Sequence, residues 1–143
     1  MTAKEFLNRA YVQSQRVQYK SEQLIQLKST TQRVTAALDS EYVSHTRNVR
    51  ALEDAVIHVI EATEQLQIEN QILADIRKEI SQVIDQVSSI TFQSILSSRY
   101  LCFKNWEDIA QERNRTMRWV QNQHKQALIE IEKIIEKTFL DFA

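Results

Sequence analysis

The side chains with the clearest chemistry in this sequence lie between residues 105 and 125. Arg118 stands three residues before Gln121 and four before Asn122, so a helix would carry all of them on one side. Arginine pairs bidentately with guanine, and glutamine or asparagine pairs in the same way with adenine. These residue types therefore suit contacts with DNA bases, with an ordinary solvated helix face as the alternative.

The basic residues of the chain are unevenly distributed. Residues 99–125 carry six lysines and arginines against three acids, whereas the rest of the chain carries twelve against sixteen. The formal net charge of the whole chain is −1, so the total favours no class of partner. A local basic excess is what a phosphate backbone would meet, although a solvated helix face can carry the same excess.

The sequence offers no pattern for catalysis, cofactor binding or metal binding. It contains no glycine, which excludes the usual phosphate-cradling loop, and no Glu-x-x-His pair of the kind that di-metal bundles use. His45 and His58 complete no ligand set, and we expect His124 to be a hydrogen-bonded packing residue. We expect Cys102, the single cysteine, to be a small buried apolar residue.

The elements that position these side chains are expected to be helices. The chain has no glycine and no proline, the residues that usually form the turns between short strands, and it is rich in good helix formers. An all-α fold follows. The N-terminus lacks a signal-peptide pattern, and no apolar run approaches the ~20 residues that a bilayer crossing needs. We therefore expect no membrane contact and a cytoplasmic location, in the cytosol.

Two long periodic segments predict a helical hairpin. A capping box formed by Thr2 and Glu5 opens the first helix, at about residues 3–38. A polar link at 39–48 precedes the second helix, at about 48–88. Apolar residues step by three and four along both helices, so we expect an antiparallel, coiled-coil-like pair over 1–88 that mediates oligomerisation or partner binding.

The predicted stripes of this hairpin repeat every seven residues. The first comprises Ala10, Val17, Leu24, Leu27, Thr31, Val34 and Leu38, widened by Phe6, Tyr11 and Ile25. The second comprises Val49, Leu52, Val56, Val59, Leu66, Leu73, Ile80, Ile84 and Val87. Thr63, Asn70 and Arg77 fall at seam positions of the second helix. They either fix the register or the oligomeric state, or face solvent.

Residues 89–143 predict a compact head of three helices. The first is expected at about 91–101. The second begins at the N-cap Asn105 and turns Trp106, Ile109 and Ala110 inward. The third begins at the N-cap Thr116, and its buried stripe comprises Val120, Ala127, Leu128, Ile131 and either Ile134 or Ile135. The five residues between Ala110 and Thr116 suit the turn of a helix-turn-helix.

The segment "LSSRYLCFKNWEDIAQERNRTMRWVQNQHKQAL", residues 96–128, resembles the C-terminal DNA-binding region of bacterial sigma factors. With "MTAKEFLNRAY" at the start and "HTRNV" at 45–49, nearly the whole chain resembles small phage proteins of Gram-positive bacteria. These proteins carry a sigma-factor-region-4-like helix-turn-helix and are similar to phage transcriptional regulators of the ArpU and RinA type.

This resemblance implies particular roles for residues of the third helix and its surroundings. Base contacts would come from Met117, Arg118, Gln121 and Asn122. Phosphate contacts would come from Lys104, Arg113, Arg115 and Lys125. The family's turn usually reads apolar–Gly–apolar, whereas here Asn114 stands between two arginines. Asparagine tolerates the left-handed conformation that the turn requires. The arginines either cover the core with their stems or mark a unit that no longer reads DNA.

Two functions follow as expectations. The first is a phage DNA-binding transcriptional regulator that acts on a double-stranded promoter or operator, as a homodimer, with RNA polymerase or another regulator as a further partner. The second is a helical protein-interaction module, an adaptor or inhibitor of a host or phage protein, whose helix-turn-helix is degenerate. Trp119 bears on both, because it either packs in the core or contacts a partner protein.

Overall fold

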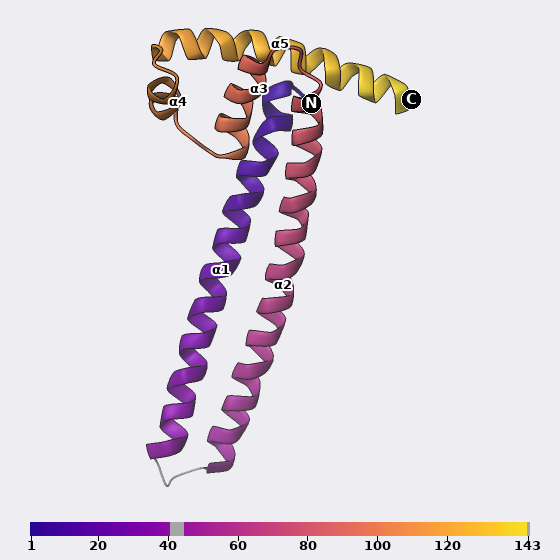
Figure 1. Cartoon of the computed structure of the whole chain (residues 1–143). Helices are drawn as coiled ribbons and strands as arrows, with labels where there is room; N and C mark the ends of the chain where they lie inside the picture. Colours follow the sequence, from indigo (N-terminus) through magenta and orange to yellow (C-terminus); the bar gives the residue numbers. More distant parts are fainter. Residues whose placement is uncertain (41–44, 143) are drawn as a thin grey trace. The chain divides into compact units, whose positions relative to one another are not determined.

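The computed structural model describes residues 1–40 and 45–142, and every regular element within those ranges is helical (Figure 1). The all-α prediction is confirmed. In chain order the elements are α1 (Ala3–Ser40), α2 (His45–Asp85), α3 (Ile90–Leu96), the π-helical turn η1 (Ser97–Leu101), α4 (Trp106–Glu112) and α5 (Met117–Phe142). None of the helices in these ranges combines the length and the apolarity that a bilayer crossing requires.

The start of α1 forms the predicted capping box. The Glu5 amide donates to Oγ1 of Thr2, and the Thr2 amide donates to Oε2 of Glu5, each over 3.2 Å. Two amides that lack a partner within the helix are thereby satisfied. At its other end α1 runs to Ser40, and α2 begins at His45, so both helices extend further into the predicted polar link than expected. Positions 41–44 of that link lie outside the described residues.

The chain divides into two compact units. One comprises residues 14–72, and the other comprises residues 1–13 together with 73–143. The second unit therefore includes the first turns of α1 and the end of α2, which the sequence assigned to the hairpin, as well as the predicted head. The assignment of partner binding to 1–88 and of DNA binding to 89–143 stays a prediction.

The unit of residues 14–72 is an antiparallel pair of helices with a shallow seam (Figure 1). Among its described side chains Leu24 is the one buried hydrophobic residue, with 9% of its surface exposed. Most other predicted stripe residues are half-buried, because two helices alone cover only part of each stripe. Ile25, at 64% exposed, and the exposed Val49 and Val56 were wrongly assigned to the buried stripes.

The polar residues at the predicted seam positions of α2 are half-buried or exposed. Thr63 is half-buried, but its hydroxyl donates within the helix to the Val59 carbonyl over 2.7 Å. Asn70 and Arg77 are exposed. The Arg77 guanidinium lies 5.9 Å from the centre of the Phe103 ring, and a role of these positions in the register or the oligomeric state stays a prediction.

The core of the second unit gathers residues from both ends of the chain. Leu7 and Ala10 of α1, Ile80 of α2, Leu96 of α3 and Ile131 of α5 are fully buried in one cluster. In Figure 1 the start of α1 and the end of α2 lie beside α3 and α5. A salt bridge of 3.2 Å between Arg9 and Glu79 ties the two long helices at this end. Phe6 is also buried, but Tyr11, predicted to widen the stripe, is 50% exposed.

The first helix of the predicted head ends differently from the expectation of a single helix over 91–101. Ser89 caps α3 by accepting from the Phe92 amide. After Leu96 the backbone widens into the π-helical turn η1, in which the Cys102 amide donates to the Ser97 carbonyl over 3.0 Å. Ser88, just before α3, donates from its hydroxyl and its amide to Glu130, which fastens the α2–α3 link to α5.

The exposure of Cys102 overturns the sequence prediction for this residue. We expected it to be buried among apolar neighbours, but its side chain is exposed. The chain leaves the π-helical turn at Cys102, and the next residue, Phe103, has a φ of 56°, in the left-handed region. A bulky side chain rarely adopts this region, and the backbone reversal carries Cys102 outward.

Candidate nucleic-acid interface

The helix α4 is built as the sequence predicts. Asn105 is its N-cap, and its side-chain oxygen accepts from the Asp108 amide over 2.8 Å. Ile109 and Ala110 are buried, and Trp106 packs half-buried against the same cluster. The small side chain of Ala110 permits the close approach of a neighbouring helix.

The turn after α4 uses asparagine where a glycine is usual. Asn114 has a φ of 53°, which confirms the predicted left-handed conformation. The Arg115 amide donates to the Ala110 carbonyl over 3.0 Å, and the Asn114 amide donates to the Gln111 carbonyl over 3.2 Å. This pair of bonds is the Schellman arrangement, and it satisfies carbonyls that the end of α4 would otherwise leave free.

Substitutions at Asn114 test this turn. We expect Asn114→Val to lower the free energy of unfolding by about 1–2 kcal/mol, because a branched side chain is disfavoured in the left-handed region. Asn114→Gly should leave it within a few tenths of a kcal/mol of the wild type, since glycine adopts that region freely. Urea unfolding followed by circular dichroism measures both. Equal losses in the two variants would argue against a left-handed residue here.

The helix α5 begins at the predicted cap. The Thr116 hydroxyl accepts from the Trp119 amide over 3.1 Å. Val120 and Ala127 are fully buried, Ile131 and Ile135 continue the buried face, and Leu128 packs beside it. Trp119 is half-buried against Ile109 and Val120, as the core interpretation predicted.

All the predicted base-contact residues are exposed at the start of α5. They are Met117, Arg118, Gln121 and Asn122, with the exposed Lys125 one turn further on. Along a helix Arg118, Asn122 and Lys125 lie roughly opposite the buried Val120 and Ala127, and Gln121 lies at the side of this solvent face. Met117 stands three residues before Val120 and flanks the buried face. The structure thus brings them together on the first two turns of the second helix of a helix-turn-helix unit.

The predicted phosphate-contact residues have more varied surroundings. Lys104 already binds Glu112, with its Nζ 2.8 Å and 3.0 Å from the two carboxylate oxygens, so a phosphate would compete with this pair. The Arg115 guanidinium lies 4.7 Å from the centre of the Trp119 ring and covers part of the small core. Arg113 is half-buried. The Arg115 side chain therefore covers an aromatic ring of the small core.

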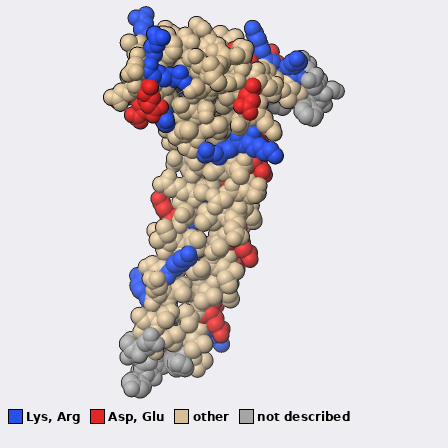
Figure 2. Space-filling view, in the orientation of Figure 1, with Lys and Arg blue, Asp and Glu red and all other residues tan. Residues whose placement is uncertain are grey.

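Acidic residues lie beside this basic end of the head. Figure 2 shows lysine and arginine atoms near the α4–α5 turn, next to a patch of aspartate and glutamate atoms. A surface hollow between the two helices is lined by Glu107 and Asp108 together with Asn114, Arg115 and Met117. A phosphate backbone would have to approach the α5 face and avoid the α4 acids.

A buried hydrogen bond joins η1 to α5, and sequence reasoning did not pair its members. The Tyr100 hydroxyl lies 2.6 Å from Nε2 of His124, and the Trp106 ring packs against the imidazole in an edge-to-face arrangement, with ring centres 4.7 Å apart. Burial, and then the charges of Arg99 and Lys4, lower the pKa of His124 to about 4. Burial raises the pKa of Tyr100 to about 12, against the opposing charge of Arg99. His124 is a hydrogen-bonded packing residue, as predicted.

The low pKa of His124 predicts a loss of stability in acid. The folded-state value is about 4 and the ordinary value is 6.5, so between these pH values the unfolded chain binds the proton more readily. The contribution is complete above about pH 6.5 and is lost as the pH falls toward about 4. We expect thermal unfolding of His124→Gln to depend less on pH than that of the wild type. The exposed His58→Gln variant should retain the wild-type pH dependence.

No constellation for metal binding emerges from the described part of the chain: it holds no group of three or more His, Cys, Asp or Glu side chains placed around one point. Two arginine side chains of this region stack on tryptophan rings. The pairs are Arg99 over Trp106, at 4.5 Å from the ring centre, and Arg115 over Trp119.

No protein-family model, curated protein or solved structure matches this chain. The sigma-factor resemblance and the roles that it implies therefore stay predictions from the sequence.

Proposed function

We propose that the protein is a DNA-binding transcriptional regulator that reads double-stranded DNA with the start of α5. The observation that carries the proposal is the pair of helices α4 and α5, joined by a Schellman turn at Asn114, with Arg118, Gln121 and Asn122 exposed together. A recognition helix presents its first turns to the base edges of the major groove. Its side chains are of the types that pair with guanine and adenine.

The sequence resemblance to phage regulators with a sigma-like helix-turn-helix supports the same role. It adds the expectation of action in the cytosol of a bacterial host, on a promoter or operator, with RNA polymerase or a second regulator as partner. A homodimer would read two half-sites related by two-fold symmetry. Light scattering of the purified protein tests the dimer independently of DNA.

Selection of DNA from a random library with the purified protein tests the proposal. A regulator should enrich one motif and bind it more weakly as salt rises, with a slope of log affinity against log salt of about −0.9 for each phosphate contacted. We expect few phosphate contacts, because acids of α4 lie beside the turn and Lys104 is already paired with Glu112. Absence of both an enriched motif and salt-dependent retention would contradict the proposal.

The unit of residues 14–72 favours a second candidate, a protein-interaction module. Its residues 51–72 carry five acids and no lysine or arginine. Ile57, Ile60, Ile68 and Ile72 are exposed on the same helix. Exposed apolar residues among charges of one sign suit a protein partner with a basic surface. Recovery of one host protein on the immobilised chain after nuclease treatment would support this module. Loss of the recovered protein on nuclease treatment would favour DNA binding.

A further inference from the structure

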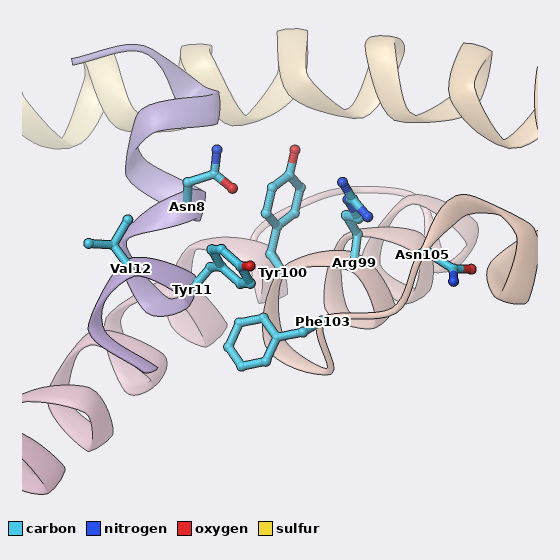
Figure 3. A pocket seen from close by; sticks show the side chains of 7 residues that line it. All are labelled: Asn8, Tyr11, Val12, Arg99, Tyr100, Phe103 and Asn105. Atoms are coloured by element: carbon cyan, nitrogen blue, oxygen red, sulfur yellow. The ribbon is translucent and has the colours of Figure 1, made fainter. Parts of the chain in front are cut away.

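A cavity of about 490 Å³ opens in the unit of residues 1–13 and 73–143, beside η1. Figure 3 shows Asn8 and Tyr11 reaching from α1 toward Tyr100 and Phe103, with Arg99 and Asn105 along the same wall. Its volume falls within the range of about 300–1,000 Å³ that is usual for sites of small molecules. It lies apart from the α5 face that the proposed DNA contact uses.

One side of the cavity is aromatic. The rings of Tyr11 and Phe103 meet edge to face, with centroids 5.7 Å apart and planes at 70°. Both rings line the cavity, and Tyr11 is half-exposed there. A flat apolar group would bury its surface against these rings and gain an aromatic contact.

Arg99 gives the cavity a positively charged group. Its NH1 donates to the Lys104 carbonyl over 3.0 Å, and its guanidinium lies over the Trp106 ring, so the group is held in place before any ligand arrives. Arginine has five N–H donors in a planar fork that fits a carboxylate or a phosphate. The described residues that line the cavity include the amides of Asn8 and Asn105 and no acid.

The backbone of this wall departs twice from ordinary helix geometry. The π-helical turn η1 carries Arg99 and Tyr100, and Phe103 stands at a φ of 56°. Such turns and such left-handed bulky residues are uncommon and are found often at functional sites. Here both departures turn side chains toward the cavity.

We propose that this cavity binds a small aromatic anion, with the ring against Tyr11 and Phe103 and the carboxylate or phosphate on Arg99. The ligand would act on the head through direct contacts. Arg99 stacks on Trp106, and Trp106 packs against His124 of α5, so a ligand that engages Arg99 is two side chains away from the predicted recognition helix. This regulatory consequence, unlike the binding itself, rests on the proposed function.

Titration of the full chain with benzoate, followed by ¹H–¹⁵N NMR, tests the binding. The chain has two tryptophans, and the Trp119→Phe variant assigns their indole signals. Benzoate should shift the Trp106 indole and the Arg99 side-chain N–H saturably, while the Trp119 indole stays in place. Acetate lacks the ring and benzyl alcohol lacks the charge, so each should bind at least tenfold more weakly than benzoate. Phenyl phosphate should behave like benzoate.

Two variants and one control locate the site. Arg99→Gln and the exposed change Tyr11→Ala should each weaken benzoate binding at least tenfold, with the amide spectrum of the fold retained. Lys133→Gln removes a positive charge from an exposed position of α5 outside the cavity and should bind benzoate as the wild type does. Equal binding of benzoate by the wild type and Tyr11→Ala, or equal binding of benzoate and acetate, would overturn the proposal.

A DNA-binding measurement with and without saturating benzoate separates this inference from the proposed function. Benzoate binding by a protein that retains no DNA supports the cavity and contradicts the regulator. DNA binding by a protein that shows no benzoate shift contradicts the cavity and leaves the regulator standing. A change in DNA affinity with benzoate supports both.

Discussion

Leu7→Ala should lower the free energy of unfolding by about 2–5 kcal/mol, the range that a fully buried leucine gives when a cavity replaces it. Leu7 is completely buried among Ile80 and Ile131, which come from α2 and α5. The first turns of α1 therefore form part of the core that supports the candidate interface. Urea unfolding followed by circular dichroism measures the loss.

Val12→Ala is the matched control for this change. Val12 lies five residues further along the same helix and is 60% exposed, so its truncation should change the stability by no more than about 0.5 kcal/mol. If the two variants unfold at the same urea concentration, the N-terminal turns do not belong to the core. If Leu7→Ala broadens the NMR signals of Ala127 and Ile131 and Val12→Ala does not, the loss of stability arises where α1 packs against α5.

Arg118→Ala should weaken binding to the selected DNA site by about 1–3 kcal/mol, or roughly 5- to 150-fold, if this side chain pairs with a base. Arg118 is exposed on the solvent face of α5, two residues before the fully buried Val120. Its loss should therefore leave the stability of the fold unchanged. Fluorescence anisotropy with the selected duplex and with an unrelated duplex measures the effect on each.

The comparison of Arg118→Ala with Arg118→Lys separates a base contact from a phosphate contact. Lysine keeps the charge but loses the planar fork, so a base contact predicts lost preference for the selected site and retained binding to the unrelated duplex. A phosphate contact predicts that lysine restores binding to both. Lys133→Ala, a charge removal at an exposed position further along α5, should weaken binding only slightly.

The two proposals make different demands on the same unit. In the two proposals Arg118 would contact DNA and Arg99 would bind the ligand of the cavity, and the two arginines lie on different elements, α5 and η1. Arg99 stacks on Trp106, and Trp106 packs against His124, which lies on the same helix as Arg118. A repressor or an activator that responds to a small molecule needs such a pair of sites and a contact between them. Because its pKa is lowered to about 4, His124 is neutral near pH 7, and the contact between Trp106 and His124 then holds no buried charge.

Features with short-range causes were predicted from the sequence alone. The capping box at Thr2 and Glu5, the caps Asn105 and Thr116, and the left-handed Asn114 each depend on residues within five positions along the chain. Hydrogen bonds of this range follow from residue type and order, because the backbone brings the groups together as soon as the helix forms. The helical class of the chain follows in the same way from composition and period.

Features that depend on distant residues were decided by the tertiary structure. Leu7 packs with Ile131, Tyr100 bonds His124, and Lys104 binds Glu112 rather than standing free. Cys102 became exposed because the chain turns at Phe103 to close the head. Periodicity marks which face of a helix is apolar but not which other helix will cover it. For this protein the sequence determined the helical class, the caps and the α4–α5 turn, but not the π-helical turn η1 that interrupts the helix expected over 91–101. Packing alone determined which residues lie buried together, because that choice depends on the shape of the whole unit.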